Sequence, residues 1–144
     1  MTRILNVAEA VLYVDDLAAN ARFYQEVLDL PQTLSFADAV FLQTGRDSTL
    51  ILFDRAQLAV RESVIPHHGS VGPGHVAFAV PAEELATWRA RLMAHDVEIE
   101  HEQIWPGGAQ SLYFRDPAGN SVELITADHY PRIWAGLQPP VSDE

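Results

Sequence analysis

The sequence predicts an α+β fold that is built from two tandem βαβββ modules. A strand-like segment at Glu9–Val14 is followed by a helix-like segment, and a second strand-like segment at His75–Val80 is followed by another. In each half, three further short apolar segments come after the helix and are separated by turn residues. A repeat of this kind indicates that each half folds as one structural unit.

The 144 residues correspond to one domain of ordinary size. Each half alone would leave one apolar sheet face uncovered, so we expect the two halves to form an open, cleft-containing mixed β-barrel with the helices outside. We place module 1 at about residues 5–60, a linker at 61–73, module 2 at about 74–128 and a tail at 129–144.

In the first half, a helix is predicted over residues 17–29, where Asp16 can act as its N-cap. Its apolar residues recur at helical spacing, and they are Leu17, Ala21, Tyr24 and Leu28. Three strands are predicted after it, at residues 33–36, 39–43 and 49–53. Proline and glycine are frequent in the linker, whose His67 and His68 we expect to be solvated loop residues.

In the second half, Pro81 begins a helix whose buried stripe is formed by Leu85, Trp88 and Leu92. Strands are predicted at residues 98–104, 110–114 and 121–126. The tail after them contains an aromatic segment, His129–Trp134, which we expect to pack on the body of the protein. The last residues, from Pro139, are expected to be disordered.

The composition excludes several classes of function. A formal net charge of -11 argues against nucleic-acid and anionic-membrane partners. Because there is no cysteine, the chain has no disulfide, no thiolate metal site and no cysteine nucleophile. No apolar run approaches the roughly 20 residues that a membrane span needs, and the N-terminus does not look like a signal peptide, so we expect a cytoplasmic protein.

The most informative stretch is the last predicted hairpin. Its turn, Asp116–Asn120, has the sequence Asp-Pro-Ala-Gly-Asn, which is a strong turn signal. The strand after it carries Glu123 between apolar residues. A carboxylate in that place is costly unless it is paired, bound to a metal or turned to solvent. For a single glutamate, a wet sheet face is the ordinary explanation.

The hairpin Tyr-Phe-Arg-Asp-Pro-Ala-Gly-Asn-Ser-Val-Glu-Leu resembles the closing hairpin of the vicinal oxygen chelate superfamily. That superfamily includes glyoxalase I, the fosfomycin-resistance thiol transferases, the extradiol dioxygenases and the bleomycin-resistance proteins. The segments Leu-Tyr-Val-Asp-Asp-Leu and Gly-His-Val-Ala-Phe, at the starts of the two modules, belong to the same resemblance. It extends over nearly all residues from Glu9 to Thr126, and it implies paired βαβββ modules.

The resemblance also implies a metal site. In the metal-dependent members, the glutamate that matches Glu123 is a ligand, and the positions of Glu9 and His75 converge with it on the cleft. The first position is usually histidine, so Glu9 departs from the common pattern. Ile51 stands where glyoxalase I carries a further glutamate. The implied site would hold a divalent ion (Mn, Fe, Ni, Zn or Mg) by three side chains and keep positions open for catalysis.

An argument from charge supports this metal site. Two carboxylates that converge in an apolar cleft repel each other unless a cation neutralises them. The alternative is that Glu9, His75 and Glu123 are independent polar residues at strand ends.

A substrate site is predicted beside the metal. Ser111, Tyr113 and Arg115 alternate along one strand and therefore share one face. The Ser-x-Tyr spacing resembles the fosfomycin-resistance enzymes, where these hydroxyls contact the phosphonate, so the three side chains are expected to bind an anionic oxygen. The alternative is an ordinary hydrogen-bonded sheet face. His101 and Trp105 are candidates for the pocket wall.

The sequence therefore predicts a metal-dependent enzyme that acts on a small oxygenated substrate. The metal would act as a Lewis acid, with Glu123 as the catalytic ligand. One histidine with two carboxylates disfavours a ring-cleaving dioxygenase, and a glyoxalase, lyase, isomerase or thiol-transferase type of reaction stays open. The alternative is a metal-free protein of the bleomycin-resistance kind that binds a cationic drug. The resemblance also implies a homodimer.

Overall fold

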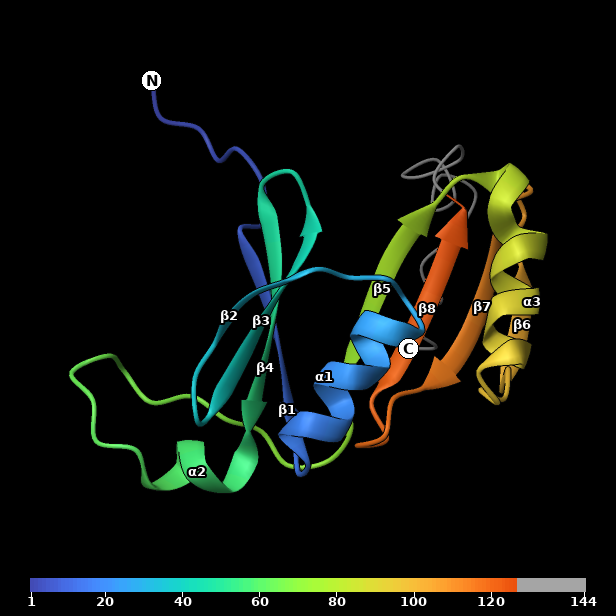
Figure 1. Cartoon of the computed structure of the whole chain (residues 1–144). Coiled ribbons are helices and arrows are strands. Elements are labelled where there is room, and N and C mark those ends of the chain that lie inside the picture. The colour runs from blue at the N-terminus through green and yellow to red at the C-terminus, as the bar shows by residue number, and fades with distance from the viewer. Residues whose placement is uncertain (127–144) are drawn as a thin grey trace, which may run out of the picture. The chain divides into compact units, whose positions relative to one another are not determined.

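The computed structural model describes residues 1–126, so the predictions for the tail at 129–144 lie outside the described residues. Figure 1 shows the order of the elements. The first module consists of β1 (Glu9–Val14), α1 (Leu17–Glu26), β2 (Gln32–Ser35), β3 (Ala39–Gly45), β4 (Ser48–Asp54) and α2 (Arg55–Val60). The second consists of β5 (His75–Val80), η1 (Ala82–Glu84), α3 (Leu85–Ala94), β6 (His101–Ile104), β7 (Gln110–Arg115) and β8 (Ser121–Thr126).

The strands form two four-stranded sheets with the same order of equivalent strands. The first sheet runs β1-β4-β3-β2, and the second runs β5-β8-β7-β6. In the first sheet β1 and β4 are parallel, whereas the β3–β4 and β2–β3 pairs are antiparallel. This confirms the predicted α+β class and the two βαβββ modules. The barrel remains an expectation about how the modules join.

Strand alternation sorts the residues of the first sheet onto two faces. Leu50 and Leu52 of β4 are fully buried, and α1 packs against β3 and β4. The intervening residues Ile51 and Phe53 form a separate apolar cluster with Ala39 and Leu58. Both faces of this sheet are therefore apolar in their central part.

Helix α1 begins as predicted and ends earlier than predicted. The Asp16 side chain accepts a hydrogen bond from the backbone N–H of Ala19 at 3.0 Å, which caps the first turn. Asp29 then adopts a left-handed φ of 58°, and the N–H of Leu30 returns to the carbonyl of Tyr24 at 3.2 Å. The helix therefore stops at Glu26 and not at residue 29, and Asp29 turns the chain just past its end.

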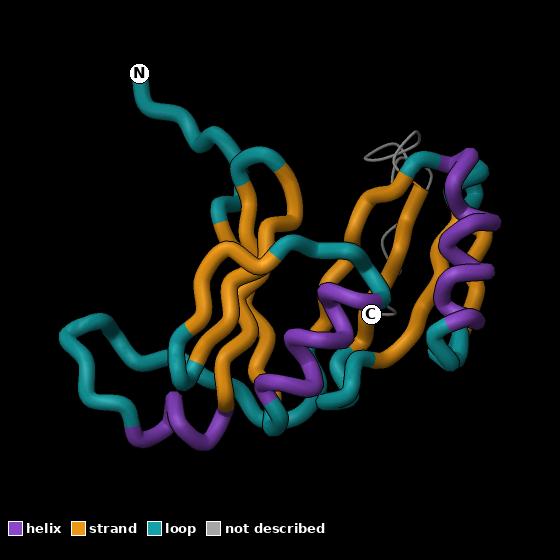
Figure 2. Tube along the Cα trace, in the orientation of Figure 1, coloured by secondary structure: helices purple, strands orange, loops and turns teal. Residues whose placement is uncertain are grey.

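The sequence did not predict α2. This short helix follows β4 directly and is capped by Asp54, whose side chain accepts from the N–H of Gln57 at 2.9 Å. It brings Leu58 onto the Ile51 cluster. The linker that follows contains no helix or strand, as predicted, and Figure 2 shows it as a continuous loop before β5.

The second sheet is close to the predicted one. Strands β5 and β8 have the predicted bounds, whereas β6 begins at His101 and not at residue 98. Helix α3 follows the short 3-10 helix η1, and its Leu85 and Leu92 are buried. Its Trp88 is partly buried and has the Arg91 guanidinium over its ring at 5.9 Å.

The described chain divides into two compact units whose boundaries differ from those of the modules. The first unit contains residues 1–76 together with 115–121, and the second contains 77–114 and 122–126. The turn between β7 and β8 thus belongs to the first unit. Among the helices of residues 1–126, none has the length and apolar character that crossing a membrane would require.

Candidate metal site and its surroundings

Glu123 lies in the middle of β8 and is buried, with only 6% of its surface exposed. One of its carboxylate oxygens, Oε1, accepts two hydrogen bonds from the neighbouring strand β7. Ser111 Oγ donates at 2.6 Å and the Tyr113 hydroxyl at 2.9 Å. The solvated sheet face considered for a lone glutamate is therefore wrong for this residue. Its carboxylate is held in one orientation by two hydroxyl groups.

Two further side chains support these hydroxyls. Trp105 Nε1 donates to Ser111 Oγ at 2.9 Å, and the indole packs against Ala109 and Ile125. The His101 ring lies 5.9 Å from the Tyr113 ring, measured between centroids. Both residues predicted for the pocket wall are thus next to the hydroxyls that bind Glu123.

The environment keeps the Tyr113 hydroxyl protonated. Burial raises the pKa of Tyr113 to about 12, and the hydrogen bond to Glu123 and the carboxylate charge act in the same direction. The hydrogen bond with Ser111 lowers this pKa by less. Tyr113 is therefore a hydrogen-bond donor throughout the neutral pH range.

His75 begins β5, and its Nδ1 lies 3.1 Å from the carbonyl oxygen of Ser121. A carbonyl can only accept, so this hydrogen bond requires the proton on Nδ1. In the neutral ring, the lone pair is then on Nε2. Glu9 occupies the equivalent place at the start of β1, where it is exposed and paired with Thr49 of β4.

The predicted ligands are distributed over both compact units, with Glu9 and His75 in the first and Glu123 in the second. Within residues 1–126, no three His, Cys, Asp or Glu side chains form a group that could hold a metal ion. The three-ligand site stays a prediction. The structure does contain two groups that suit such a site: the His75 imidazole, whose tautomer is fixed, and the Glu123 carboxylate, whose orientation is fixed.

Arg115 takes part in the β7–β8 turn. Its Nη1 donates to the carbonyl of Gly119 at 3.1 Å. Ser111 and Tyr113, its predicted partners in substrate binding, direct their hydroxyls to Glu123. The proposed anion site of these three residues also stays a prediction.

Sequence reasoning missed a buried polar network around the same turn. The Tyr24 hydroxyl of α1 donates to Asp116 Oδ2 at 2.8 Å. Burial raises the pKa of Tyr24 well above its ordinary value, and the Asp116 charge and this hydrogen bond raise it further. Asn20, also on α1, accepts from the N–H of Ala118 at 3.2 Å. The Asp-Pro-Ala-Gly-Asn turn was visible in the sequence, but its partners on α1 were not.

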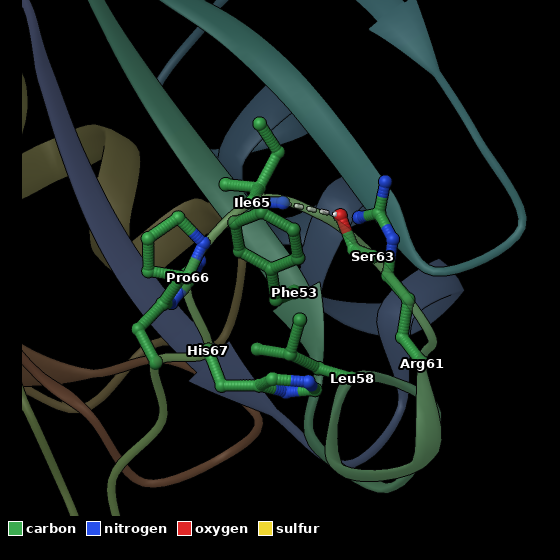
Figure 3. Close-up of a pocket in the computed structure, with 8 residues that line it drawn as sticks. Phe53, Leu58, Arg61, Ser63, Ile65, Pro66 and His67 are labelled. Carbon is green, nitrogen blue, oxygen red and sulfur yellow. Dashed lines mark hydrogen bonds between the residues drawn. The ribbon is translucent and has the colours of Figure 1, made fainter.

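His68 is an exposed loop residue, as expected, and its side chain also makes specific contacts with the first module. Its Nδ1 is 2.6 Å from the Tyr13 hydroxyl, and its ring makes an edge contact with Phe53 at 5.0 Å. The linker and α2 enclose a pocket of about 90 Å³, which Figure 3 shows. It is lined by Phe53, Leu58, Arg61, Ser63, Ile65, Pro66, His67 and His68.

The profile of the Glyoxalase/Bleomycin resistance protein/Dioxygenase superfamily matches residues 5–124. The crystal structure of a lactoylglutathione lyase from Agrobacterium tumefaciens is 36% identical, with a TM-score of 0.84, over 90% of this chain and 99% of that one. The metallothiol transferase FosB of Bacillus licheniformis is 25% identical over 91% of this chain and 81% of its own length.

A superfamily protein from Nocardioides is 23% identical, with a TM-score of 0.69 over 88% of this chain and 85% of that one, which supports the fold alone. The first module's Ile51 is buried at 3% exposure, so the position that would carry a fourth ligand is apolar. The chain belongs to the glyoxalase/bleomycin resistance protein/dioxygenase superfamily.

Proposed function

We propose that this protein is a divalent-metal-dependent enzyme that acts on a small oxygenated substrate, with Glu9, His75 and Glu123 as the metal ligands. The observation that carries the proposal is the Glu123 carboxylate, which is buried and receives two hydroxyl donors on one oxygen. Carboxylate ligands of metal sites are held by second-shell hydrogen bonds of this kind. A merely structural glutamate at this place would bury a charge at a cost that an apolar residue avoids.

The donor set suits a hard or borderline divalent cation. One imidazole nitrogen and two carboxylates are competent ligands for Mn, Fe, Ni, Zn or Mg, and the chain has no thiolate that would favour softer ions. His75 fits because its Nδ1 proton is directed to a backbone carbonyl, which is the usual support of a histidine ligand. When bound, such an ion supplies Lewis-acid stabilisation of negative charge on a substrate oxygen.

The protein's own groups have distinct roles in this proposal. Tyr113 stays protonated because its pKa is raised to about 12, so its single hydroxyl proton can hold Glu123 in the free protein or be donated instead to a substrate oxygen that approaches the same side. Ser111 shares this role, and Trp105 holds the Ser111 hydroxyl in place. Arg115 would provide the positive charge for an anionic substrate group.

The proposed ligand count leaves more than one type of reaction open. With Ile51 in place of a fourth ligand, three side chains would hold the metal and more than one coordination position would remain for water and substrate. Among the relatives, lactoylglutathione lyase carries out a lyase reaction and metallothiol transferase a thiol transfer, and both reaction types are compatible with such a site. We further propose that the protein is a homodimer.

The rival proposal is a metal-free protein that binds a cationic drug, and the net charge of -11 is the observation in its favour. The buried Glu123 carboxylate with its two hydroxyl donors favours the enzyme, because a metal-free drug-binding protein does not need a set of metal ligands.

Metal analysis of the purified protein tests the proposal. We expect about one divalent ion per chain, and we expect His75→Ala and Glu123→Ala to lose it while far-UV circular dichroism shows both to be folded. His67→Ala is the matched control, because it removes an exposed histidine of the linker and should bind metal like the wild type. Normal metal content in both ligand variants would show that the site is elsewhere.

A further inference from the structure

Asn120 is the centre of the polar network at the start of β5 and β8. It is buried, with 1% of its surface exposed. Its amide Nδ2 donates to Asp116 Oδ2 at 3.0 Å, and its backbone N–H donates to Asp116 Oδ1 at 2.8 Å. Its amide oxygen accepts from the backbone N–H of Gly74 at 2.7 Å. A single side chain thus connects the turn to the residue before His75.

The orientation of this amide is fixed by its partners. A carboxylate can only accept, so the amide nitrogen must face Asp116 and the amide oxygen must face Gly74. Asp116 is in turn held by the Tyr24 hydroxyl at 2.8 Å. Hydrogen bonds to a charged group are stronger than those between neutral groups, which favours the two bonds to Asp116. Each link between α1 and Gly74 is thus a hydrogen bond with a defined donor and acceptor.

Gly74 is held on both of its backbone groups. Its N–H donates to Asn120 Oδ1, and its carbonyl accepts from the N–H of Ser121 at 2.9 Å. The approach is close, since a Cβ at Gly74 would lie 3.0 Å from Leu12 Cδ2 and 3.4 Å from Asn120 Oδ1. The next residues along the two strands, His75 and Ser121, then meet through His75 Nδ1 and the Ser121 carbonyl at 3.1 Å.

We propose that Asn120 is a positioning residue that fixes the orientation and the tautomer of His75. By holding Gly74 against the start of β8, it places the Ser121 carbonyl opposite His75 Nδ1. Neutral histidine in water favours the proton on Nε2, whereas this carbonyl favours the proton on Nδ1. In that tautomer the lone pair is on Nε2, which would be the coordinating atom in the proposed metal site. The coordination of a metal by Nε2 rests on the proposed function, whereas the position of the proton on Nδ1 does not.

Long-range proton–nitrogen NMR of the metal-free protein tests the tautomer directly, at a pH where the ring is neutral. In the wild type we expect the His75 signals of an Nδ1–H ring. In Asn120→Ala we expect them to shift towards the Nε2–H form, together with a roughly 10–100-fold loss of divalent-metal affinity in a competition assay with a chelator. If Asn120 were only a structural residue, a folded Asn120→Ala variant would keep both the wild-type His75 signals and the wild-type metal affinity.

Asn20→Ala is the matched control. Asn20 is the same residue type, is equally buried, and binds the same turn through Ala118, but it has no bond to Gly74. It should lose stability and keep both the wild-type tautomer and the metal affinity. If Asn120→Ala does not fold, Gly74→Ala provides the second variant, because its methyl group displaces the same junction without removing a hydrogen-bonding group.

An Nε2–H ring in the wild type would overturn the proposal without reference to any metal. So would an Asn120→Ala variant that keeps both the tautomer and the metal affinity, or an Asn20→Ala variant that changes them equally. If the wild type shows the Nδ1–H ring but binds no divalent ion, the proposed enzyme function fails. The tautomer comparison between the two asparagine variants still decides the role of Asn120 in that case.

Discussion

Ile51 and Glu123 occupy equivalent places on the fourth strand of the two modules, yet their surroundings are opposite in character. Ile51 is 3% exposed and lies in an apolar cluster with Phe53 and Leu58. Its cross-strand partner is Phe41. Glu123 is 6% exposed and is bound by two hydroxyls of the third strand of its module. The same backbone position is structural in one module and carries the candidate chemistry in the other.

The comparison shows that the side chains, and not the backbone, distinguish the two modules. Both sheets have the same strand order, and strand alternation directs the equivalent side chains to equivalent faces. What differs is the set of side chains on that face. Substitutions that exchange the two sets therefore test the comparison directly.

The largest effect is expected from Ile51→Glu. This change places a carboxylate among apolar side chains, where burial raises its pKa by several units. A shift of three units corresponds to about 4 kcal/mol at neutral pH. Because the folded pKa is raised, stability is lost as the pH rises above about 4.3, the ordinary value of the glutamate pKa. Urea unfolding at acidic and neutral pH measures the effect, with Ile51→Val as the control at about 0.5–1.5 kcal/mol. A variant as stable as the wild type at both pH values would contradict this account of the Ile51 cluster.

A smaller effect is expected from Tyr113→Phe, which gives the second module an aromatic ring without the hydroxyl, as Phe41 does in the first. The loss of a hydrogen bond to a carboxylate costs about 1.5–3 kcal/mol. Combined with Glu123→Ile, the same change should cost much less, because no carboxylate is then left unsatisfied. A double-mutant cycle of unfolding free energies measures this coupling. Additive effects would show that the hydroxyl and the carboxylate are independent.

The alkaline pH dependence provides a third test. The pKa of Tyr113 is raised to about 12, above the ordinary tyrosine value of about 10. A raised folded pKa gives a contribution that is present below about pH 10 and lost between about pH 10 and 12. The loss should stay well under 1.4 kcal/mol per pH unit, the limit for one proton. Wild-type stability should therefore fall more steeply than that of Tyr113→Phe between about pH 9.5 and 11. If the stability of the wild type and of Tyr113→Phe falls in parallel over this pH range, groups other than Tyr113 cause the alkaline loss of stability.

The smallest effect on stability is expected at Glu9, which is exposed. Glu9→His makes the start of β1 match the start of β5, and its unfolding free energy should change by no more than about 0.5 kcal/mol. Metal should be retained, with a preference shifted towards softer ions. Glu9→Leu should leave the fold intact and weaken metal binding strongly. Unchanged affinity in Glu9→Leu, measured by isothermal titration calorimetry, would remove Glu9 from the site.

Local patterns in the sequence predicted most of the fold. The bounds of β1, β5 and β8 follow from short apolar runs, and the turn at residues 116–120 follows from its proline and glycine. The end of α1 was missed because Asp29, a residue that tolerates the left-handed conformation, stops it earlier. Helix α2 was missed because six residues are too few to show a helical period.

The candidate site was predictable only in part. His75 and Glu123 are visible as polar residues on apolar strands, and the repeat makes Glu9 and Ile51 comparable with them. The contact of Ser111 and Tyr113 with Glu123 depends on the pairing of β7 with β8, which a hairpin turn indicates but does not fix to the atom. The contact of Tyr24 with Asp116 spans 92 positions of the chain, and no local pattern specifies a partner at that separation.

The membership of residues 115–121 in the first compact unit has a consequence for the integrity of the chain. A fragment that ends in the linker would lack Asp116, and the buried Tyr24 hydroxyl would lose its acceptor. The complementary fragment would carry an exposed turn in which Asp116 and Ala118 have no helix to bind. Neither repeat is therefore self-sufficient, although the duplication is plain in the sequence. The two halves should behave as a split protein, in which each fragment folds fully only by complementation with the other.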